Sequence, residues 1–347
     1  MTESITERND FNKKVDVLAE YSQFYEKTFL QYIGSKRKLL PSLVKHITGK
    51  VIIDLMAGTH SLGYYFKDKK KVYANDIMYY SYLIGKANIE SSILTLKPLE
   101  IRKDKGFIFF EKHYSGTYFT LKQCQQLDSL KYSIENLSND NLKACYYSCV
   151  FNILDRVATT AGHFDGFLKS NTKKAQIRKF KDVIEYFERE VENFKNKKNV
   201  FGSKVYNLEA LDFLKIIEDA DTIYIDPPYN HRQYNTLYHI LEMFAKYSGK
   251  LKDCMYKYPE ERYYSPYCYK SQALKAFDTL ISEAIKKSNH IVFSYSNKGL
   301  VPIEDLINLF RKYFHGIIKE EISYYHRKQK TSKGDGFVSE YIFSLSN

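Results

Sequence analysis

Short apolar segments alternate with longer amphipathic segments over much of the chain. Four of the apolar segments are rich in β-branched or aromatic residues and end at an acidic residue: 51–54, 71–76, 204–209 and 222–226. Their length and composition are typical of buried strands, whereas the intervening segments have the period of helices. A further apolar segment begins at His290. This alternation predicts an α/β fold built on a mainly parallel, Rossmann-like sheet.

Residues 97–199 interrupt the alternation with helical patterns. They predict three long helices, at 118–136, 141–158 and 175–195, with a polar, glycine-containing loop at 159–169. We interpret this region as a helical insertion that contacts nucleic acid, and a packed helical cap with solvated lysines is the alternative. The predicted parts of the chain are a polar helical extension, an α/β domain in two pieces and the insertion: 1–28, 29–96 with 200–347, and 97–199.

The segment Asp226-Pro-Pro-Tyr229, which we call the signature, ends one of the predicted strands. Two prolines cannot donate ladder hydrogen bonds, so the strand must stop there. In open α/β sheets, ligands bind at this edge. The Asp226 carboxylate and the Pro227 carbonyl could accept both N–H bonds of an exocyclic base amine, and Tyr229 could stack on the base. Such alignment and charge stabilisation favour attack by a poor nucleophile.

Other predicted strand ends carry groups that suit a nucleoside with a cationic tail. Asp54 and Gly58 lie in a turn from strand to helix, where an acid disfavours a pyrophosphate and suits an amino group. Asp76 ends the next strand, where an acid typically holds ribose hydroxyls, although a helix N-cap is the alternative role. Tyr32 and Lys36 flank a tight turn that opens a helix, and its backbone N–H groups suit an anion.

Composition narrows the class of partner. The 53 Lys and Arg residues exceed the 41 Asp and Glu residues, which gives a net charge of +12 and favours a polyanion. No apolar run approaches the length that spans a bilayer, and the first residues have no apolar signal core. The five cysteines form no CxxC pair, and we predict no metal site. We therefore expect a cytoplasmic protein.

Together, the motifs resemble the Dam-like, α-group family of DNA adenine N6-methyltransferases. They occur in one order: Tyr32-Ile-Gly-Ser-Lys36, Asp54 to Gly63, Asn75-Asp76, then Asp226 to Tyr229. The resemblance covers about residues 29–96 and 200–347. It implies a Rossmann-like S-adenosylmethionine-dependent methyltransferase sheet with a helical insertion that reads double-stranded DNA. It also implies a monomer or weak dimer from a bacterium or phage that associates with the nucleoid when bound to DNA. The enzyme is expected to be a solitary or phage methylase or part of a restriction-modification system, in the last case with a cognate endonuclease.

The resemblance assigns roles to individual residues. Those implied at S-adenosylmethionine are Tyr32, Lys36, Asp54, Gly58, Asp76, Glu209 and Asp226, and those implied at the flipped adenine are Asp226, Pro227, Pro228 and Tyr229. Glu209 stands where the family more often has aspartate, with Asp212 as the alternative. His60 stands where glycine is commoner, and a positive φ there would be strained. Candidate DNA contacts, in the insertion, after the signature and at a basic hairpin tip, are His163, Lys173, Arg232, Tyr234, Arg327, Lys328 and Lys330.

Three other functions compete with DNA adenine methylation. RNA adenine N6-methylation and cytosine N4-methylation keep the chemistry, but related RNA and cytosine enzymes more often carry Asn or Ser at the position of Asp226. A catalytically inactive DNA-binding relative is disfavoured because Asp54, Asp76, Asp226 and Tyr229 are all present. The recognition sequence leaves no motif, because base readout is idiosyncratic.

Overall fold

The computed structural model describes residues 6–8, 30, 32–160, 162–169, 171–325 and 337–347. Their strands form one eight-stranded sheet in the order β1-β7-β8-β6-β5-β2-β3-β4. The strands are β1 Thr6–Arg8, β2 Val51–Asp54, β3 Lys71–Asn75, β4 Lys204–Tyr206, β5 Thr222–Ile225, β6 His290–Ser296, β7 Gly316–Tyr325 and β8 Phe337–Ser346. β2 to β6 pair in parallel, and β8 runs antiparallel between β6 and β7. The predicted α/β fold is confirmed.

The order of the strands reverses between β2 and β5. β3 and β4 lie on one side of β2, whereas β5 and β6 lie on the other. Loops that leave adjacent parallel strands toward opposite faces separate there and open a crevice beyond their carboxyl ends. β2 ends at Asp54, and β5 is followed at once by Asp226. The topology therefore brings two of the predicted site residues to the same crevice.

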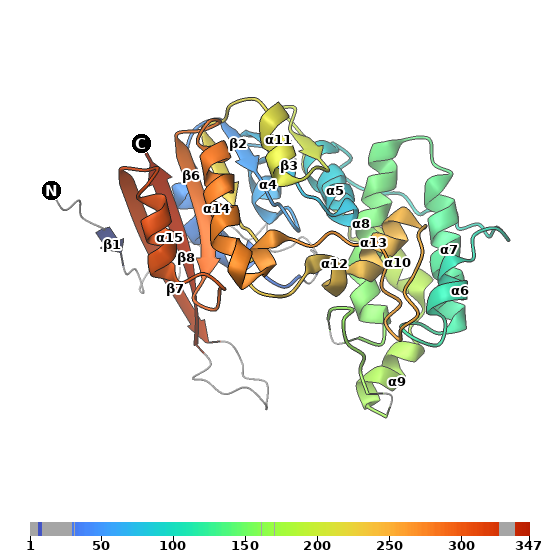
Figure 1. Cartoon of the computed structure of the whole chain (residues 1–347). Coiled ribbons are helices and arrows are strands. Elements are labelled where there is room, and N and C mark those ends of the chain that lie inside the picture. The colour runs from blue at the N-terminus through green and yellow to red at the C-terminus, as the bar shows by residue number, and fades with distance from the viewer. Residues whose placement is uncertain (1–5, 9–29, 31, 161, 170, 326–336) are drawn as a thin grey trace.

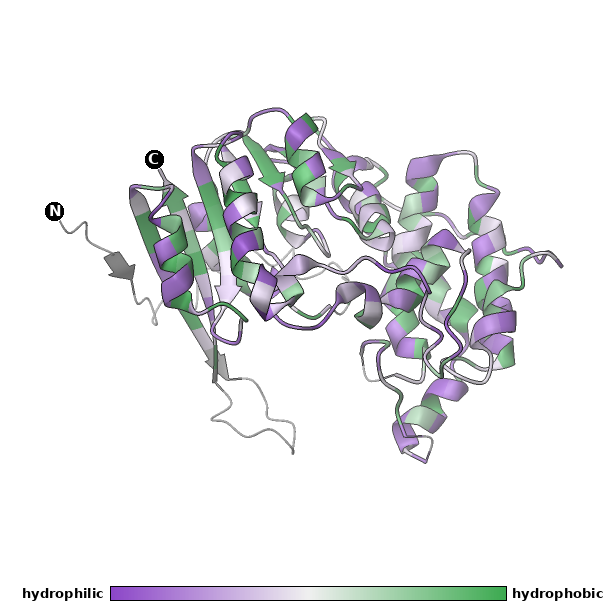
Figure 2. Ribbon diagram, in the orientation of Figure 1, coloured by the Kyte–Doolittle hydropathy of each residue, from purple (hydrophilic) through white to green (hydrophobic). Residues whose placement is uncertain are grey.

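Helices cover both faces of the sheet (Figure 1). The α/β part contains α3 Leu40–Leu43, α4 Ser61–Phe66, α5 Tyr79–Gly85, α11 Ala210–Ile216, α14 Lys270–Ala284 and α15 Ile303–Phe310. Alternate strand residues enter opposite cores: Ile53 and Ile223 pack with α11, α14 and α15, whereas Ile52 and Tyr224 pack with α3 and α4. The strands are accordingly hydrophobic over most of their length (Figure 2). Among the described residues, no helix is both long and apolar enough to cross a membrane.

The helical part has its own core beside the sheet. Its helices are α6 Phe109–Tyr114, α7 Leu121–Glu135, α8 Asp140–Val157, α9 Lys173–Lys179, α10 Val183–Glu192, α12 Tyr234–Leu237 and α13 His239–Lys246. The buried residues of α7 and α8 pack with those of α5 and with 237–245. The segment after the signature, which we assigned to the α/β domain, thus shares the core of residues 97–199. The apolar residues Ile240, Leu241 and Phe244 explain why it packs there.

Some predicted elements differ from the observed ones. The helix predicted at 175–195 is two helices, because the Asp182 side chain caps α10 by accepting from the N–H groups of Ile184 and Glu185. The helix expected at His231 begins only at Tyr234. Within the extension predicted to be helical, Thr6–Arg8 form a strand that pairs in parallel with β7, whose edge offers unpaired backbone groups. The rest of residues 1–28 lies outside the described residues.

Candidate functional site

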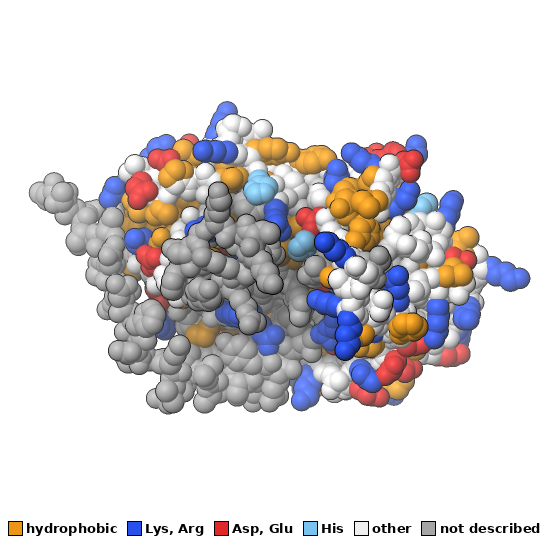
Figure 3. Space-filling model, turned by 90° about the horizontal axis from the view of Figure 1, so that it is seen from below, with side chains coloured by type: hydrophobic (Ala, Val, Ile, Leu, Met, Phe, Trp, Pro, Cys, Tyr) orange, Lys and Arg blue, Asp and Glu red, His pale blue; other side chains and the backbone are white. Residues whose placement is uncertain are grey.

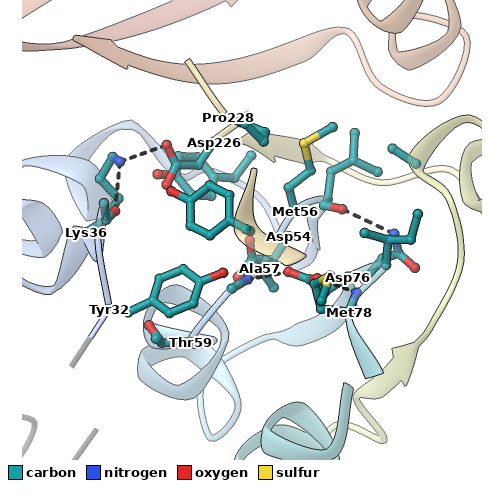
Figure 4. A pocket seen from close by; sticks show the side chains of 18 of the residues that line it. Tyr32, Lys36, Asp54, Met56, Ala57, Thr59, Asp76, Met78, Asp226 and Pro228 are labelled. Carbon is teal, nitrogen blue, oxygen red and sulfur yellow. Dashed lines mark hydrogen bonds and ion pairs between the residues drawn. The ribbon is translucent and has the colours of Figure 1, made fainter. Parts of the chain in front are cut away.

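The predicted strand-end residues surround one pocket in the crevice (Figure 4). All seven residues implied at the cofactor line it: Tyr32, Lys36, Asp54, Gly58, Asp76, Glu209 and Asp226. Pro228 also lines the pocket, whereas Pro227 and Tyr229 lie directly beside these lining residues in the chain. The lining residues lie within 54–62, 75–78, 208–210 and 224–228, at or after the ends of β2 to β5, and within 32–43, 233–235 and 263–267. The fold therefore assembles residues from distant parts of the chain, since Tyr32 and Tyr267 are 235 positions apart (267 − 32 = 235).

Asp226 is held through one of its two carboxylate oxygens. The Lys36 ammonium lies 2.8 Å from Oδ1, and the Ser294 hydroxyl donates to the same oxygen at 3.1 Å. Lys36 also donates to the Gly34 carbonyl at 2.9 Å. Burial raises the pKa of Asp226, against the opposing effects of Lys36 and Ser294. Because both contacts use Oδ1, the arrangement orients the carboxylate while leaving Oδ2 for another donor.

Lys36 is a buried cation between two carboxylates. Burial lowers the pKa of Lys36, but the charges of Asp226 and Glu340 more than offset this, and the pKa is raised. The ammonium also lies 5.2 Å from the centroid of the Tyr229 ring. Lys36 therefore stays charged at neutral pH and links the turn at Gly34 to the signature.

Asp54 is a buried carboxylate that suits a cationic ligand. It is 2% exposed, and its Oδ1 accepts no hydrogen bond within the described part of the chain. Burial, together with the charges of Asp226 and Asp76, raises the pKa of Asp54 to about 8. A buried carboxylate oxygen without a partner is costly, and a bound ammonium group would remove that cost. The site therefore fits the amino group of a methionine moiety.

Asp76 is not the N-cap of α5, which is Met78, but it accepts hydrogen bonds from two backbone N–H groups. Its Oδ2 accepts from the Gly58 N–H at 2.8 Å, and its Oδ1 accepts from the Met78 N–H at 2.8 Å. Burial raises the pKa of Asp76 to about 6 despite these hydrogen bonds. The side chain thus fixes the glycine turn and the start of α5, and it lines the pocket as well. Each carboxylate oxygen has a further lone pair available for a ligand hydroxyl.

The turn after β2 requires a left-handed backbone at two positions. Gly58 has φ +54°, and a Cβ there would lie 3.3 Å from the Tyr32 ring. His60 has φ 59°, so it adopts the positive φ that would be strained for a histidine. Its Nε2 lies 2.8 Å from the Ser81 carbonyl, and burial lowers the pKa of His60 to about 4. A neutral, buried imidazole therefore occupies the position beneath the turn without lining the pocket.

Glu209, and not Asp212, lies at the pocket. The Glu209 side chain accepts from the Leu211 N–H at 2.7 Å and caps α11 while lining the pocket. Asp212 is 62% exposed and pairs with Lys215. Of the two acids considered at this position, only Glu209 is placed to meet a ligand.

The candidate DNA contacts fall into three groups. Tyr234 lies in the pocket wall, stacked on Tyr32 at 5.2 Å and donating to the Ile33 carbonyl, because α12 packs against the turn at Gly34. Lys173 and Arg232 are exposed, and His163 pairs with Asp165. Arg327, Lys328 and Lys330 lie outside the described residues. Tyr234 therefore lines the same pocket as Asp54 and Asp226.

Sequence reasoning did not single out several residues at the site. Ser294 and Glu340 contact the signature from β6 and β8, and Tyr238 stacks on Tyr32 at 4.5 Å and bonds the Ile33 N–H. Tyr263 also lines the pocket, from a tyrosine-rich loop at residues 256–269. The only sequence signal for Ser294 and Glu340 is the apolar pattern of β6 and β8, because alternate residues of a strand lie on the same face of the sheet. Among the described residues, no group of three or more His, Cys, Asp or Glu side chains could hold a metal ion.

Comparison with known proteins agrees with this geometry. The modification methylase StsI of Streptococcus sanguinis is 32% identical over 91% of this chain, and M.NlaIII of Neisseria lactamica is 32% identical over 82%. M.FokI of Planomicrobium okeanokoites is 28% identical over 91%. The chain spans 52% of the StsI and FokI methylases and 88% of M.NlaIII. Residues 32–309 match the model of one family, and the chain belongs to that family, the D12 class N6 adenine-specific DNA methyltransferases.

Proposed function

We propose that this chain transfers a methyl group from S-adenosylmethionine to the N6 amine of an adenine flipped out of duplex DNA. The supporting observation is that Asp226 opens onto the same pocket as Asp54, Gly58 and Asp76. A base held at the signature therefore lies beside a ligand held at the other three residues. The order of the motifs, with the insertion between the glycine turn and the signature, supports the Dam-like, α-group assignment. Type II methylases among the relatives support a role in restriction-modification, with a cognate endonuclease as partner.

Within this proposal, each side chain has a defined task. S-adenosylmethionine, when bound, supplies an electrophilic methyl group. Asp54 meets its ammonium group, Asp76 its ribose and Glu209 its adenine, with Tyr32 and Lys36 at the border. Asp226 and the Pro227 carbonyl accept the two N–H bonds of the target amine and hold its lone pair toward the pocket. Tyr229 offsets part of the cost of base extrusion by stacking, which is worth about 1–3 kcal/mol.

A methyl-transfer assay with matched substrates tests the proposal. The protein is supplied with S-adenosylmethionine labelled in the methyl group and with duplex DNA, single-stranded DNA or RNA. We expect label to enter duplex DNA and, after digestion to nucleosides, to be found in N6-methyladenine. Label in N4-methylcytosine or in RNA would support the competing activities instead. No transfer to any substrate would indicate an inactive DNA-binding relative.

Asp76 provides a prediction about cofactor binding. Asp76→Ala should weaken S-adenosylmethionine binding about 10- to 100-fold, because it removes charged hydrogen bonds to the ligand and frees the turn at Gly58. Calorimetry measures the change. Asp212→Ala, which removes an exposed acid of the neighbouring α11, is the matched control and should leave affinity unchanged. Equal affinities for both variants would exclude Asp76 from the site.

We further propose that the helical part reads the DNA sequence. Residues 166–181 contain six basic residues and no acidic one. Within them α9 exposes Lys173 and Lys174, and Phe180 at its end is 88% exposed. α9 lies at the lower end of the helical part in Figure 1. Seen from below, this part of the molecule carries many lysine and arginine side chains (Figure 3). A basic surface with an exposed aromatic ring suits a nucleic acid.

Contacts join this surface to the segment after the signature. The Phe164 N–H donates to the Leu237 carbonyl at 2.7 Å, and Phe167 stacks on Tyr256 with ring centroids 5.2 Å apart. The insertion loop and the tyrosine-rich loop therefore form one continuous structure. This continuity supports the proposal that DNA held by the insertion is also presented to the signature.

Lysines at the start of α9 should contribute to DNA affinity regardless of sequence. The double variant Lys173→Glu/Lys174→Glu should bind all duplexes more weakly, and the slope of log K against log salt should fall by about two because two phosphate contacts are lost. Fluorescence anisotropy over a salt series measures both. The control variant Lys103→Glu/Lys105→Glu alters two lysines in an exposed loop. A salt slope equal to that of the native protein would place the DNA elsewhere.

A further inference from the structure

A buried carboxylate on the antiparallel strand β8 contacts Tyr229, the last residue of the signature. Glu340 is 4% exposed, and the Tyr229 hydroxyl donates to its Oε1 at 3.3 Å. Glu340 pairs with Ser296 on β6 and with Ile322 on β7, so its backbone is fixed on both sides. Burying a carboxylate costs free energy unless it is paired, so the buried position of Glu340 requires partners such as the Tyr229 hydroxyl.

Glu340 completes a set of contacts that fixes the Tyr229 ring. The ring packs edge to face on Tyr295 with centroids 5.7 Å apart, and the Leu300 N–H donates to the Tyr229 carbonyl at 2.8 Å. The backbone and one side of the ring are therefore held without Glu340. The hydroxyl contact adds the third point that defines the plane of the ring. A ring that stacks on a base must keep that plane, because stacking depends on near-parallel rings.

Glu340 also interacts electrostatically with Lys36. The Lys36 ammonium touches Asp226 at 2.8 Å, and the carboxylate of Glu340 is the second charge that keeps Lys36 protonated. Lys36 thus links Glu340 to Asp226, the carboxylate that the proposed function places at the target amine. Charge arranged in advance around a reacting group stabilises a transition state.

We propose that Glu340 is a positioning residue for methyl transfer, acting on the target base through Tyr229 and Lys36. The inference rests on the proposed function. Glu340 itself does not line the pocket. It holds the stacking ring in its plane, and it places a second negative charge near Lys36.

Three variants test this proposal in the full-length chain. Glu340→Ala removes both effects and should lower kcat about tenfold or more while changing the Kd of S-adenosylmethionine less than about twofold. Glu340→Gln keeps an acceptor for the Tyr229 hydroxyl but no charge, and its kcat should lie between those of Glu340→Ala and the native protein. Glu321→Ala, an exposed glutamate of the same hairpin, is the control and should have native kcat.

A double variant separates positioning from a merely structural role. Tyr229→Phe should lower kcat about threefold or more in the native chain and have no further effect in Glu340→Ala, because coupled residues are not additive. A general loss of stability would instead make the two changes multiply. That result, or a kcat of Glu340→Ala within about twofold of native, would overturn the proposal.

Two further outcomes are decisive. If Glu340→Ala does not fold, native kcat values for both Glu340→Gln and Tyr229→Phe would overturn the proposal. If the native protein transfers no methyl group to DNA, the proposed function fails. If the native protein is active and Glu340→Ala is equally active, only the proposal for Glu340 fails.

Discussion

Asp226→Ala is expected to abolish methyl transfer while leaving S-adenosylmethionine binding and duplex affinity nearly unchanged. The carboxylate is placed to meet the target amine, whereas Asp54, Asp76 and Glu209 remain for the cofactor. Loss of a prearranged electrostatic contact in a dry site lowers kcat by about 100- to 1000-fold, and loss of alignment adds to this. Single-turnover kinetics with labelled cofactor measure the rate, and calorimetry measures both affinities.

Removal of Asp226 also leaves Lys36 without its ion-pair partner, so a second variant is needed that keeps a side chain in contact with Lys36. In Asp226→Ala the buried ammonium keeps the Gly34 carbonyl but loses its 2.8 Å ion pair. Asp226→Asn retains the shape and an acceptor for Lys36 and Ser294 without the charge, so it separates charge from packing. Asp219→Ala, an acid that is 82% exposed before β5, is the matched control. Appreciable turnover by both Asp226 variants would contradict the assigned role.

Asp54→Asn is expected to abolish cofactor binding and yet stabilise the ligand-free protein at alkaline pH. The pKa of Asp54 is raised from its usual range to about 8, so the folded state favours the neutral acid. Folding therefore loses stability as the pH rises from about 4 to 8, where the unfolded chain ionises and the folded chain resists ionisation. Asparagine removes this cost. At pH 8 the Tm of the variant should exceed that of the native protein by several degrees, and the gap should close toward pH 4.

The same group makes cofactor binding depend on pH. The ammonium group needs the ionised form of Asp54, so the affinity of the native protein should rise up to about tenfold per pH unit between 6 and 8 and then level off. Asp68→Asn alters an acid near the protein surface that pairs with Lys197, and it should keep the native profile. Calorimetry and thermal melts over this pH range measure both effects. A native affinity that is flat with pH, or a native Tm for Asp54→Asn at pH 8, would exclude the buried anion as the ligand for the ammonium group.

The strand ends were predictable because the signals are local. An apolar run followed by Asp54 and Gly58, or by Asp226 and two prolines, identifies a strand, its end and a chemical group within ten residues. Parallel pairing then brings such ends to one edge of the sheet, wherever they lie in the chain. Five of the seven residues implied at the cofactor, Asp54, Gly58, Asp76, Glu209 and Asp226, lie at or shortly after such strand ends, and all seven line one pocket.

Contacts between distant segments were not predictable in this way. Ser294 and Glu340 lie 68 and 111 residues after the signature residues that they contact, and no local pattern distinguishes them from other polar residues of β6 and β8. Tyr234 follows the signature closely, and its role as a DNA contact stays a prediction. Its place in the fold was not predictable, because the half-buried side chain donates to the distant Ile33 carbonyl and lines the pocket.

Sequencing of modified bases in DNA from an expressing host tests the central claim most directly. The host should lack adenine methylation of its own, and it should express either the native chain or Asp226→Ala in equal amounts. We predict N6-methyladenine at one short sequence throughout the DNA of cells with the native chain, and none in cells with the variant. Unmodified adenine with the native chain, N4-methylcytosine in its place, or equal methylation by the variant would contradict the account.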